Sequence, residues 1–387
     1  MRVITRNYRI EANSKVKNLD KFRGCLIGGA AGDALGYAVE FLDNSSIVFR
    51  YGKSGITAYD CRNEIAEISD DTQMTLFTAT GLLLGKTRGM TRGIRAPYPT
   101  YIYLCYQDWY RTQTESYPLP EGYHYSWLVN QPEMFACREP GNTCLSALKS
   151  SIRGTIENPI NNSKGCGGIM RVAPIGLYFD GEFVSIERID RIAAETAALT
   201  HGHSLGFIPA AGFAHIIQLV SHNDSITILE AVEDMKRAIA QQFASDAHLG
   251  EFLHLIEKAI VLSKAHMDDS EAIQKIGQGW VAEETLAIAV YCSLKYHNDF
   301  EKALIAAVNH SGDSDSTGAI TGNIVGAYLG LKGIPQKYLN HLELRNVILE
   351  IADDLFNDCK MTEYGSYRDE IWEKKYIYNS YSIKETM

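Results

Sequence analysis

Apolar residues recur at intervals of three and four along most of the chain beyond Ser185, which is the pattern of helices with one buried face. This pattern predicts helices over residues 189–199, 205–220, 226–243, 253–263, 281–294, 300–308, 318–331 and 344–355. Strand signals are scarce, and residues 172–184 are the best candidate for a short hairpin or loop. The expected fold class is therefore all-α, with about a dozen helices in a single domain.

The first half of the chain is less regular. Residues 22–35 (FRGCLIGGAAGDAL) are small, apolar and glycine-rich, which favours a buried helix that other helices approach closely. An apolar periodic run follows Asp71, with acidic residues in what would be its first turn. Residues 88–142 are rich in Tyr, Trp, Pro and Gly, and we expect short helices there, joined by long surface connections.

The two ends differ from the rest. Residues 1–20 form a polar leader, residues 21–360 the predicted domain, and residues 361–387 an extension with five tyrosines and one tryptophan. We expect this extension to pack its aromatic side chains onto the domain, and a role in partner binding is the alternative.

Composition excludes some classes of function and leaves others open. The formal net charge of −10 argues against a general nucleic-acid binder but permits a local site for an anionic ligand. No signal-peptide core is visible near the start, and the apolar stretch 205–220 is too short to span a bilayer. The eight cysteines are scattered without a CxxC pair, which predicts free thiols in a reducing cytoplasm. Because the apolar stretch is short, no membrane association is expected.

Two acidic clusters carry the clearest chemical signal. One is Ser69-Asp70-Asp71-Thr72 and the other is Asp313-Ser314-Asp315-Ser316, and each stands directly before an apolar helical run. Taken singly, each cluster is explained as a helix N-cap that contributes up to about 1 kcal/mol. Taken together, their carboxylate and hydroxyl oxygens are the ligands that Mg²⁺ or Mn²⁺ prefers, provided that the two turns meet.

The chain resembles the ADP-ribosylglycohydrolases, including the bacterial dinitrogenase-reductase-activating type, at these two clusters and at four further segments. The four are RGCLIGGAAGDALGYAVEF at 23–41, NNSKGCGGIMRVAP at 161–174, LTHGHSLG at 199–206 and GWVAEETLAIAV at 279–290. All six follow the family order and cover most of the chain.

The resemblance implies an all-α, orthogonally packed bundle with a binuclear metal site. The implied ligands of two Mg²⁺ (or Mn²⁺) ions are Ser69, Asp70, Asp71, Asp313, Asp315 and Ser316. The ions would hold the ribose distal to the adenosine, and a water on them would attack its anomeric carbon. The implied catalytic residues are therefore Asp70, Asp71 and Asp315, joined by Glu40.

Glu40 follows the apolar run GDALGYAV, where the family carries a glutamate near the metal site. It could donate a proton to the departing side chain or orient the substrate. A surface glutamate at a helix end is the alternative. Asp33, within the same run, is expected to be buried and hydrogen-bonded, with no catalytic role.

The predicted substrate-binding residues lie in a glycine-rich turn and beside it: Ser163, Lys164, Gly165, Cys166, Gly167 and His201. Exposed backbone amides of such a turn can bind the diphosphate of ADP-ribose. Cys166 stands where relatives often have asparagine, and it is not expected to be a nucleophile. Lys164 stands where some relatives have an aromatic residue, and its charge could complement phosphate.

Two histidines and two residues of the segment 279–290 remain to be assigned. His201 could contact the distal ribose or be satisfied at a helix end, and His203 is favoured less as a ligand contact. Trp280 and Glu283 are expected to shape and brace the site without touching substrate.

The function that these expectations describe is hydrolysis of the bond between ADP-ribose and a modified side chain, most simply arginine. The implied partners are an ADP-ribosylated protein substrate and a cognate ADP-ribosyltransferase, if the protein serves as a toxin antidote. Two alternatives remain: a protein that binds ADP-ribose or blocks a transferase without catalysis, and a metal-dependent nucleotide phosphohydrolase.

Overall fold

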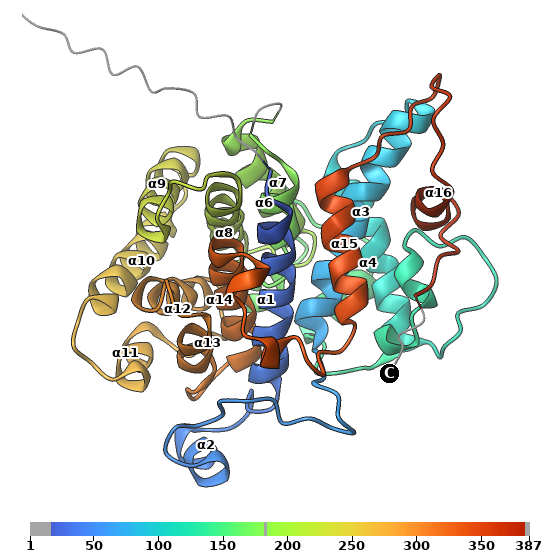
Figure 1. Cartoon of the computed structure of the whole chain (residues 1–387). Coiled ribbons are helices and arrows are strands. Elements are labelled where there is room, and N and C mark those ends of the chain that lie inside the picture. The colour runs from blue at the N-terminus through green and yellow to red at the C-terminus, as the bar shows by residue number, and fades with distance from the viewer. Residues whose placement is uncertain (1–16, 182–183, 384–387) are drawn as a thin grey trace, which may run out of the picture.

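The computed structural model describes residues 17–181 and 184–383 of the chain. Within these residues the regular structure consists of sixteen α-helices and five short 3₁₀ helices, with no strand beyond three isolated bridges (Figure 1). The all-α class is therefore confirmed. The polar leader falls largely outside the described residues, which begin just before the first helix.

The helices have the following bounds: α1 Leu19–Tyr37, α2 Asn44–Tyr51, α3 Asp70–Arg92, α4 Tyr98–Thr114, α5 Asn142–Lys149, α6 Ala173–Tyr178, α7 Ile186–Ala198, α8 Ser204–His222, α9 Ile228–Gln242, α10 Leu249–Ser263, α11 Asp269–Ile276, α12 Ala282–Lys295, α13 Phe300–Val308, α14 Ser314–Leu329, α15 Arg345–Asn357 and α16 Glu370–Tyr376. Each of the eight helices predicted beyond Ser185 is present, within a few residues of its predicted bounds.

The centre of the fold is the antiparallel pair α1 and α14. Glycines at intervals of four on one face of α1 meet small residues of α14: Gly24 meets Gly326, Gly28 meets Gly322, Gly32 meets Gly318 and Gly36 meets Ser314. A Cβ atom on any of these α1 glycines would overlap the backbone of α14. The two backbones therefore touch because side chains are missing there, as the small-residue pattern of 22–35 predicted.

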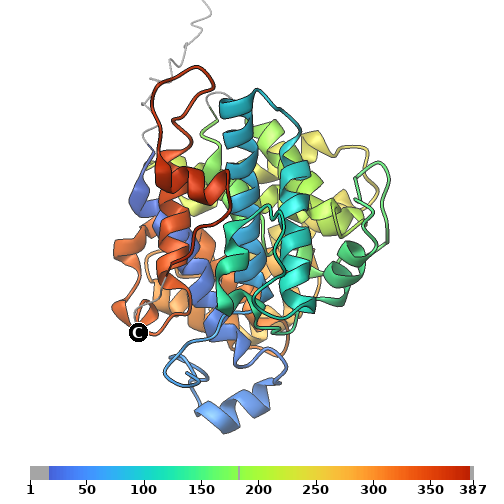
Figure 2. The same cartoon turned by 90° about the vertical axis from the view of Figure 1, so that its right-hand side faces the viewer.

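The other helices pack in two groups on either side of this pair. Figure 1 shows α3, α4, α15 and α16 on one side of α1 and α8 to α13 on the other. Figure 2, turned by 90°, shows α3 and α4 running side by side across the front of the first group. Gly81 and Gly85 of α3 abut Ile102 and Tyr101 of α4, so these two helices also approach closely.

Two predictions in the first half of the chain are wrong. Residues 98–114 form the long helix α4, not a short surface helix, and it buries Tyr106 and Trp109 in the core. Its buried residues recur every three or four positions, but the prolines and aromatic residues around it obscured that period. The short hairpin or loop expected at 172–184 begins instead as the helix α6, with Pro174 in its first turn; residues 182–183 lie outside the described part.

Helix α8 also differs from expectation, because its 19 residues are long enough to cross a membrane by length and composition. Most of the helix is buried inside the protein, however, as in the core helix of a globular domain. Its one central titratable residue, His215, pairs with Asp190 at 2.9 Å, and both side chains are fully buried. We therefore interpret α8 as a long helix of the hydrophobic core.

The C-terminal extension packs on the domain as expected. Trp372 of α16 donates from its indole nitrogen to Thr87 of α3 at 2.9 Å, and Tyr381 lies edge-on to Trp127. Lys375 and Tyr376 both bond Asp354 of α15. All eight cysteines are free, in agreement with the predicted thiols.

Replacing Gly322 with alanine tests the contact between α1 and α14. We expect Gly322→Ala to lower the free energy of unfolding by about 1–3 kcal/mol, because the new methyl group overlaps the backbone of Gly28. The matched control is Gly250→Ala, on α10, where a Cβ meets nothing within 4 Å. Chemical denaturation should show the control unchanged or slightly stabilised; equal losses in both variants would contradict the proposed role of the contact.

Candidate active site

The two acidic clusters meet in the structure. Asp70 and Asp71 occupy the first turn of α3, Asp313 is the N-cap of α14, and Asp315 lies in its first turn. Ser69, at the N-cap of α3, and Ser316, on α14, complete the set, and none of the six side chains is more than 5% exposed. Each cluster caps its own helix, and the two turns also meet, which is the condition that the metal-site hypothesis set.

The carboxylates of this cluster have few groups to neutralise them. Burial, followed by the charge of Asp315, raises the pKa of Asp70, Asp71 and Asp313 well above the usual range of an aspartic acid. Within the described residues, none of these side chains forms an ion pair with lysine, arginine or histidine, and Asp71 Oδ2 has no hydrogen-bond partner. The cluster therefore attracts protons or another cation.

Asp33 explains how the N-terminus of α3 is held here. Its fully buried carboxylate accepts hydrogen bonds from the Ser69 amide at 3.0 Å and from the Thr72 amide at 3.1 Å. Asp33 follows Gly32, which touches Gly318 of α14, so one turn of α1 holds both acidic turns in place. The prediction that Asp33 is buried and hydrogen-bonded is confirmed.

Glu40 lies beside the cluster, just beyond the end of α1. It is 8% exposed, which contradicts the alternative of a surface glutamate. Burial, together with the charges of Asp315, Asp313 and Asp70, raises its pKa to about 11, and its Oε2 atom has no partner. A carboxyl group that keeps its proton at neutral pH is suited to act as a general acid.

The glycine-rich turn also borders the cluster, through Cys166. The Cys166 amide donates to the Trp280 carbonyl at 3.2 Å, and the Ala282 amide donates to the Lys164 carbonyl at 2.9 Å, which joins the turn to the start of α12. Burial and the neighbouring carboxylates of Asp313 and Asp71 raise the pKa of the Cys166 thiol. The thiol is therefore a poor nucleophile.

His201 and Lys164 support this turn in different ways. His201 lies against Gly165 and Gly167, and burial lowers its pKa to about 3, so that it is neutral. The Lys164 ammonium forms a close ion pair with Glu283 and lies 4.0 Å from Glu251, so its charge is already partly compensated. This ion pair is the kind of brace expected of Glu283.

His203 is placed differently from His201. Its Nδ1 atom accepts from the Leu205 amide at 3.0 Å as the N-cap of α8, and its ring lies against His248. A capping role accounts for its position.

Several residues of the site escaped the sequence analysis. The fully buried Arg171 donates to Thr200 Oγ1 at 2.6 Å and stacks on Tyr106, with 4.5 Å from the guanidinium carbon to the ring centroid. It braces the segment that carries His201. The Gly141 amide donates to Asp70 Oδ2 at 3.2 Å. Arg171 lies within the recognised segment 161–174, which could have marked it, whereas nothing in the sequence marks Gly141.

Arg138 holds the segment that leads to Gly141. Its guanidinium donates to the Ile68 carbonyl at 2.9 Å and pairs with both oxygens of Glu343, of which the Oε1 contact is 2.9 Å. Its side chain is 13% exposed and that of Glu343 7%. This ion pair ties the approach to α5 to the approach to α3.

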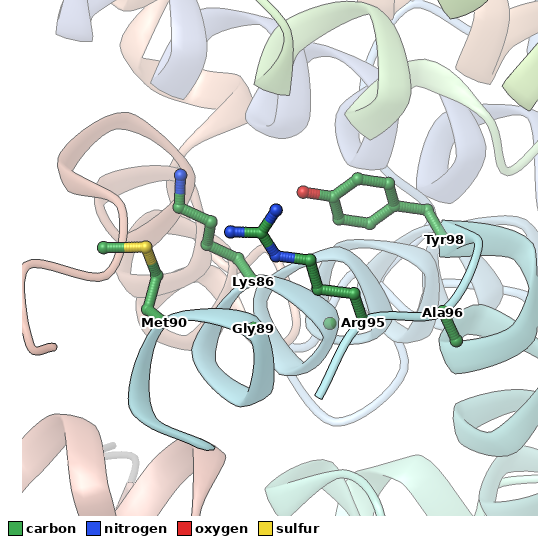
Figure 3. Close-up of a pocket in the computed structure, with 7 residues that line it drawn as sticks. Lys86, Gly89, Met90, Arg95, Ala96 and Tyr98 are labelled. Carbon is green, nitrogen blue, oxygen red and sulfur yellow. The ribbon is translucent and has the colours of Figure 1, made fainter. Parts of the chain in front are cut away.

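A hollow lies toward the C-terminal end of α3, away from the carboxylates of the cluster. Lys86, Arg95 and Tyr98 surround it (Figure 3), and its volume is about 280 Å³. Lys86 is roughly 24 Å from Asp70 along the helix. The Lys86 ammonium pairs with Asp358 at 3.1 Å. An ion pair within the protein therefore explains the position of this lysine.

Comparison with known proteins identifies the family of the chain. The sequence model of the ADP-ribosylglycohydrolases matches residues 14–364. The chain belongs to the ADP-ribosylglycohydrolase family. The solved structure of an ADP-ribosylglycohydrolase-related protein complex has the same fold, with a TM-score of 0.57 and 23% identity over 88% of this chain and 98% of that one.

Three relatives of this ADP-ribosylglycohydrolase have names that describe an activity. Mouse ADP-ribosylhydrolase ARH3 is 24% identical over 85% of this chain and 89% of its own. The Rhodospirillum rubrum ADP-ribosyl-[dinitrogen reductase] glycohydrolase is 25% identical over 84% and 91%. The Pseudomonas putida ADP-ribosylarginine hydrolase Tri1 is 24% identical over 88% and 78%.

Removing the Arg138 guanidinium should destabilise the approach to the site. We expect Arg138→Ala to lower the free energy of unfolding by about 3 kcal/mol, because Glu343 would be left buried without its partner. The matched control is Arg62→Ala: Arg62 also pairs with Glu67, but its side chain is 74% exposed. Thermal and urea unfolding should show a loss of about 0–1 kcal/mol in the control, and similar losses in both would refute the assignment.

Proposed function

We propose that this protein is a Mg²⁺- or Mn²⁺-dependent hydrolase that removes ADP-ribose from arginine side chains of modified proteins. The observation that carries the proposal is the buried meeting of two acidic helix N-termini beside a glycine-rich turn. Family membership supports the reaction class, and the name of the Pseudomonas relative supports arginine. The mouse and Rhodospirillum names do not state a linkage.

The chemistry of the cluster fits the divalent cations that its family implies. The candidate ligands offer only oxygen atoms, which hard cations prefer, and they are the aspartates and serines Ser69, Asp70, Asp71, Asp313, Asp315 and Ser316. An unpartnered, buried Asp71 oxygen supports the fit. Within the described residues, no three carboxylate, imidazole or thiol groups stand close enough to hold an ion without side-chain movement. Small side-chain rotations toward a common centre are therefore part of the proposal.

The protein side chains and amides divide the remaining tasks. Bound cations would supply charge that fixes the ribose hydroxyls and lowers the pKa of water. The amides of the glycine-rich turn would bind the diphosphate, with neutral His201 lying behind them. The closed packing around the six buried residues limits access of bulk water.

Glu40 would deliver the proton that the leaving group needs. Hydrolysis breaks the bond between C1″ of the ribose and a guanidinium nitrogen, and the bonding pair leaves with nitrogen. The Glu40 carboxyl proton passes to that nitrogen and restores the guanidinium, while water adds its hydroxyl to C1″ and returns a proton to Glu40. Burial is the largest cause that raises the pKa of Glu40, and it favours the protonated form that a general acid needs.

The biological setting that we propose follows the same reasoning. The substrate is an ADP-ribosylated protein, and a cognate ADP-ribosyltransferase is the enzyme whose product this protein would reverse. Eight free thiols are compatible with the cytoplasm as its location.

The first test measures release of intact ADP-ribose from an arginine-ADP-ribosylated protein. We expect release with Mg²⁺ or Mn²⁺, none with EDTA, and a loss of at least about 100-fold in Asp315→Ala. The matched control is Asp268→Ala, which removes a capping carboxylate at the N-terminus of α11 and should leave the rate unchanged.

Other outcomes of that test point to the alternatives. Release only from serine-linked or base-linked substrates would keep the reaction and change the acceptor. Free phosphate in place of intact ADP-ribose would indicate a nucleotide phosphohydrolase. Tight binding of ADP-ribose without turnover of any substrate would indicate a protein that binds ADP-ribose or blocks a transferase.

A further inference from the structure

A cavity of about 310 Å³ opens at the end of α1, where Ala38 and Phe41, two neighbours of Glu40 in the sequence, line it. Tyr37 and Phe41 give this wall two aromatic rings, and the charged residues around the rest of the cavity are Arg50, Asp60, Arg62, Glu67 and Glu139. Phe41 is 64% exposed and stacks on Trp280, with ring centroids 5.8 Å apart. Because the Trp280 carbonyl bonds the glycine-rich turn, this aromatic pair connects the cavity to that turn.

Of the three carboxylates that line the cavity, two have arginine partners and one has none among the described residues. Asp60 pairs with Arg50 at 2.7 Å and also accepts from the Tyr51 hydroxyl. Glu67 lies 3.4 Å from Arg62 and 3.4 Å from Arg138. Glu139 has no ion pair or hydrogen bond to its side chain among the described residues, although it lines the same space.

The backbone holds Glu139 firmly in place. Its φ of 48° is in the left-handed region, which non-glycine residues rarely adopt and which tends to occur where function requires it. The residue before it, Arg138, is anchored to Ile68 and Glu343. Two residues after it, the Gly141 amide bonds the Asp70 carboxylate. Glu139 is thus fixed between two anchors, and one of them is a carboxylate of the active site.

The cavity also lies where the leaving group must emerge. Glu139 is close enough to Glu40 for its charge to act on that carboxyl, in addition to the nearer aspartates. If Glu40 protonates the departing nitrogen, as proposed above, the leaving group lies next to Glu40, and Ala38 and Phe41 on either side of that residue line this cavity. A guanidinium suits such surroundings, because it is planar, always charged, rich in donors and able to stack on aromatic rings.

We propose that this cavity is the acceptor pocket, lined by Tyr37, Phe41, Glu67 and Glu139, and that Glu139 determines its specificity for a guanidinium-bearing acceptor. The assignment rests on the proposed function, since it describes the second half of the same substrate. Glu139 accepts hydrogen bonds from the nitrogens of the modified arginine that do not carry ribose. A serine acceptor offers no charge to this carboxylate.

The experiment compares Glu139→Gln with wild type on ADP-ribosyl-arginine. The expected result is a 10- to 100-fold lower kcat/KM, from the loss of one charge-assisted hydrogen bond. The inhibition constant of free ADP-ribose should not change, because free ADP-ribose has no acceptor. The matched control is Glu64→Gln: Glu64 is also exposed and has a positive φ of 65°, but it does not line the pocket, and its rate should equal that of wild type.

The possible outcomes distinguish a failure of the acceptor-pocket inference from a failure of the proposed function. An unchanged kcat/KM in a folded Glu139→Gln variant overturns the inference and leaves the proposed function intact. An equal weakening of ADP-ribose inhibition also overturns it, because the residue would then act on the shared half of the substrate. If wild type hydrolyses no substrate, the proposed function fails, and the pocket is tested by titration with agmatine, which carries a guanidinium. Binding of agmatine by wild type but not by Glu139→Gln supports the acceptor pocket. No binding by wild type overturns it.

Discussion

The direct backbone contact between α1 and α14 is the constraint on which the rest of this structure depends. Gly28 and Gly322 can touch only because neither carries a side chain, and the same holds for Gly24 with Gly326 and for Gly32 with Gly318. The contact fixes where α14 begins. Asp33, on the same helix α1, fixes where α3 begins. Two acidic turns that are far apart in the sequence therefore share one buried site, because one helix positions both.

The clustering of buried carboxylates lowers the stability of the fold at the place where the candidate active site needs them. Several buried carboxylates in one place repel each other, and burial raises their pKa values, so the ionised cluster weakens the folded state. Backbone amides at the two helix N-termini offset part of that cost, as the Ser316 amide does for Asp315 at 2.9 Å. The tightly packed core around α1 supplies the stability that permits such a cluster, and a cation would relieve the remaining repulsion.

Helices with a clear apolar period were predictable from the sequence, and so was the pairing of the two acidic clusters once the family pattern had been recognised. Helix α4 was not, because its prolines and aromatic residues resemble those of a surface loop, although Trp109 and Tyr106 are fully buried. Glu139 was not predictable either. Its significance depends on which neighbouring carboxylates have found arginine partners, and sequence spacing carries no information about those pairings across the fold.

The glycine contact also bears on how such proteins evolve. A methyl group at Gly24, Gly28 or Gly32 would force two helices apart, so backbone overlap restricts which residues these positions can accept. The same stretch is among those by which the family is recognised. A descendant that lost its aspartates but kept these glycines would keep the fold and still resemble its relatives. Resemblance among such proteins can therefore outlast the acidic cluster, because the glycines that set the fold lie at other positions.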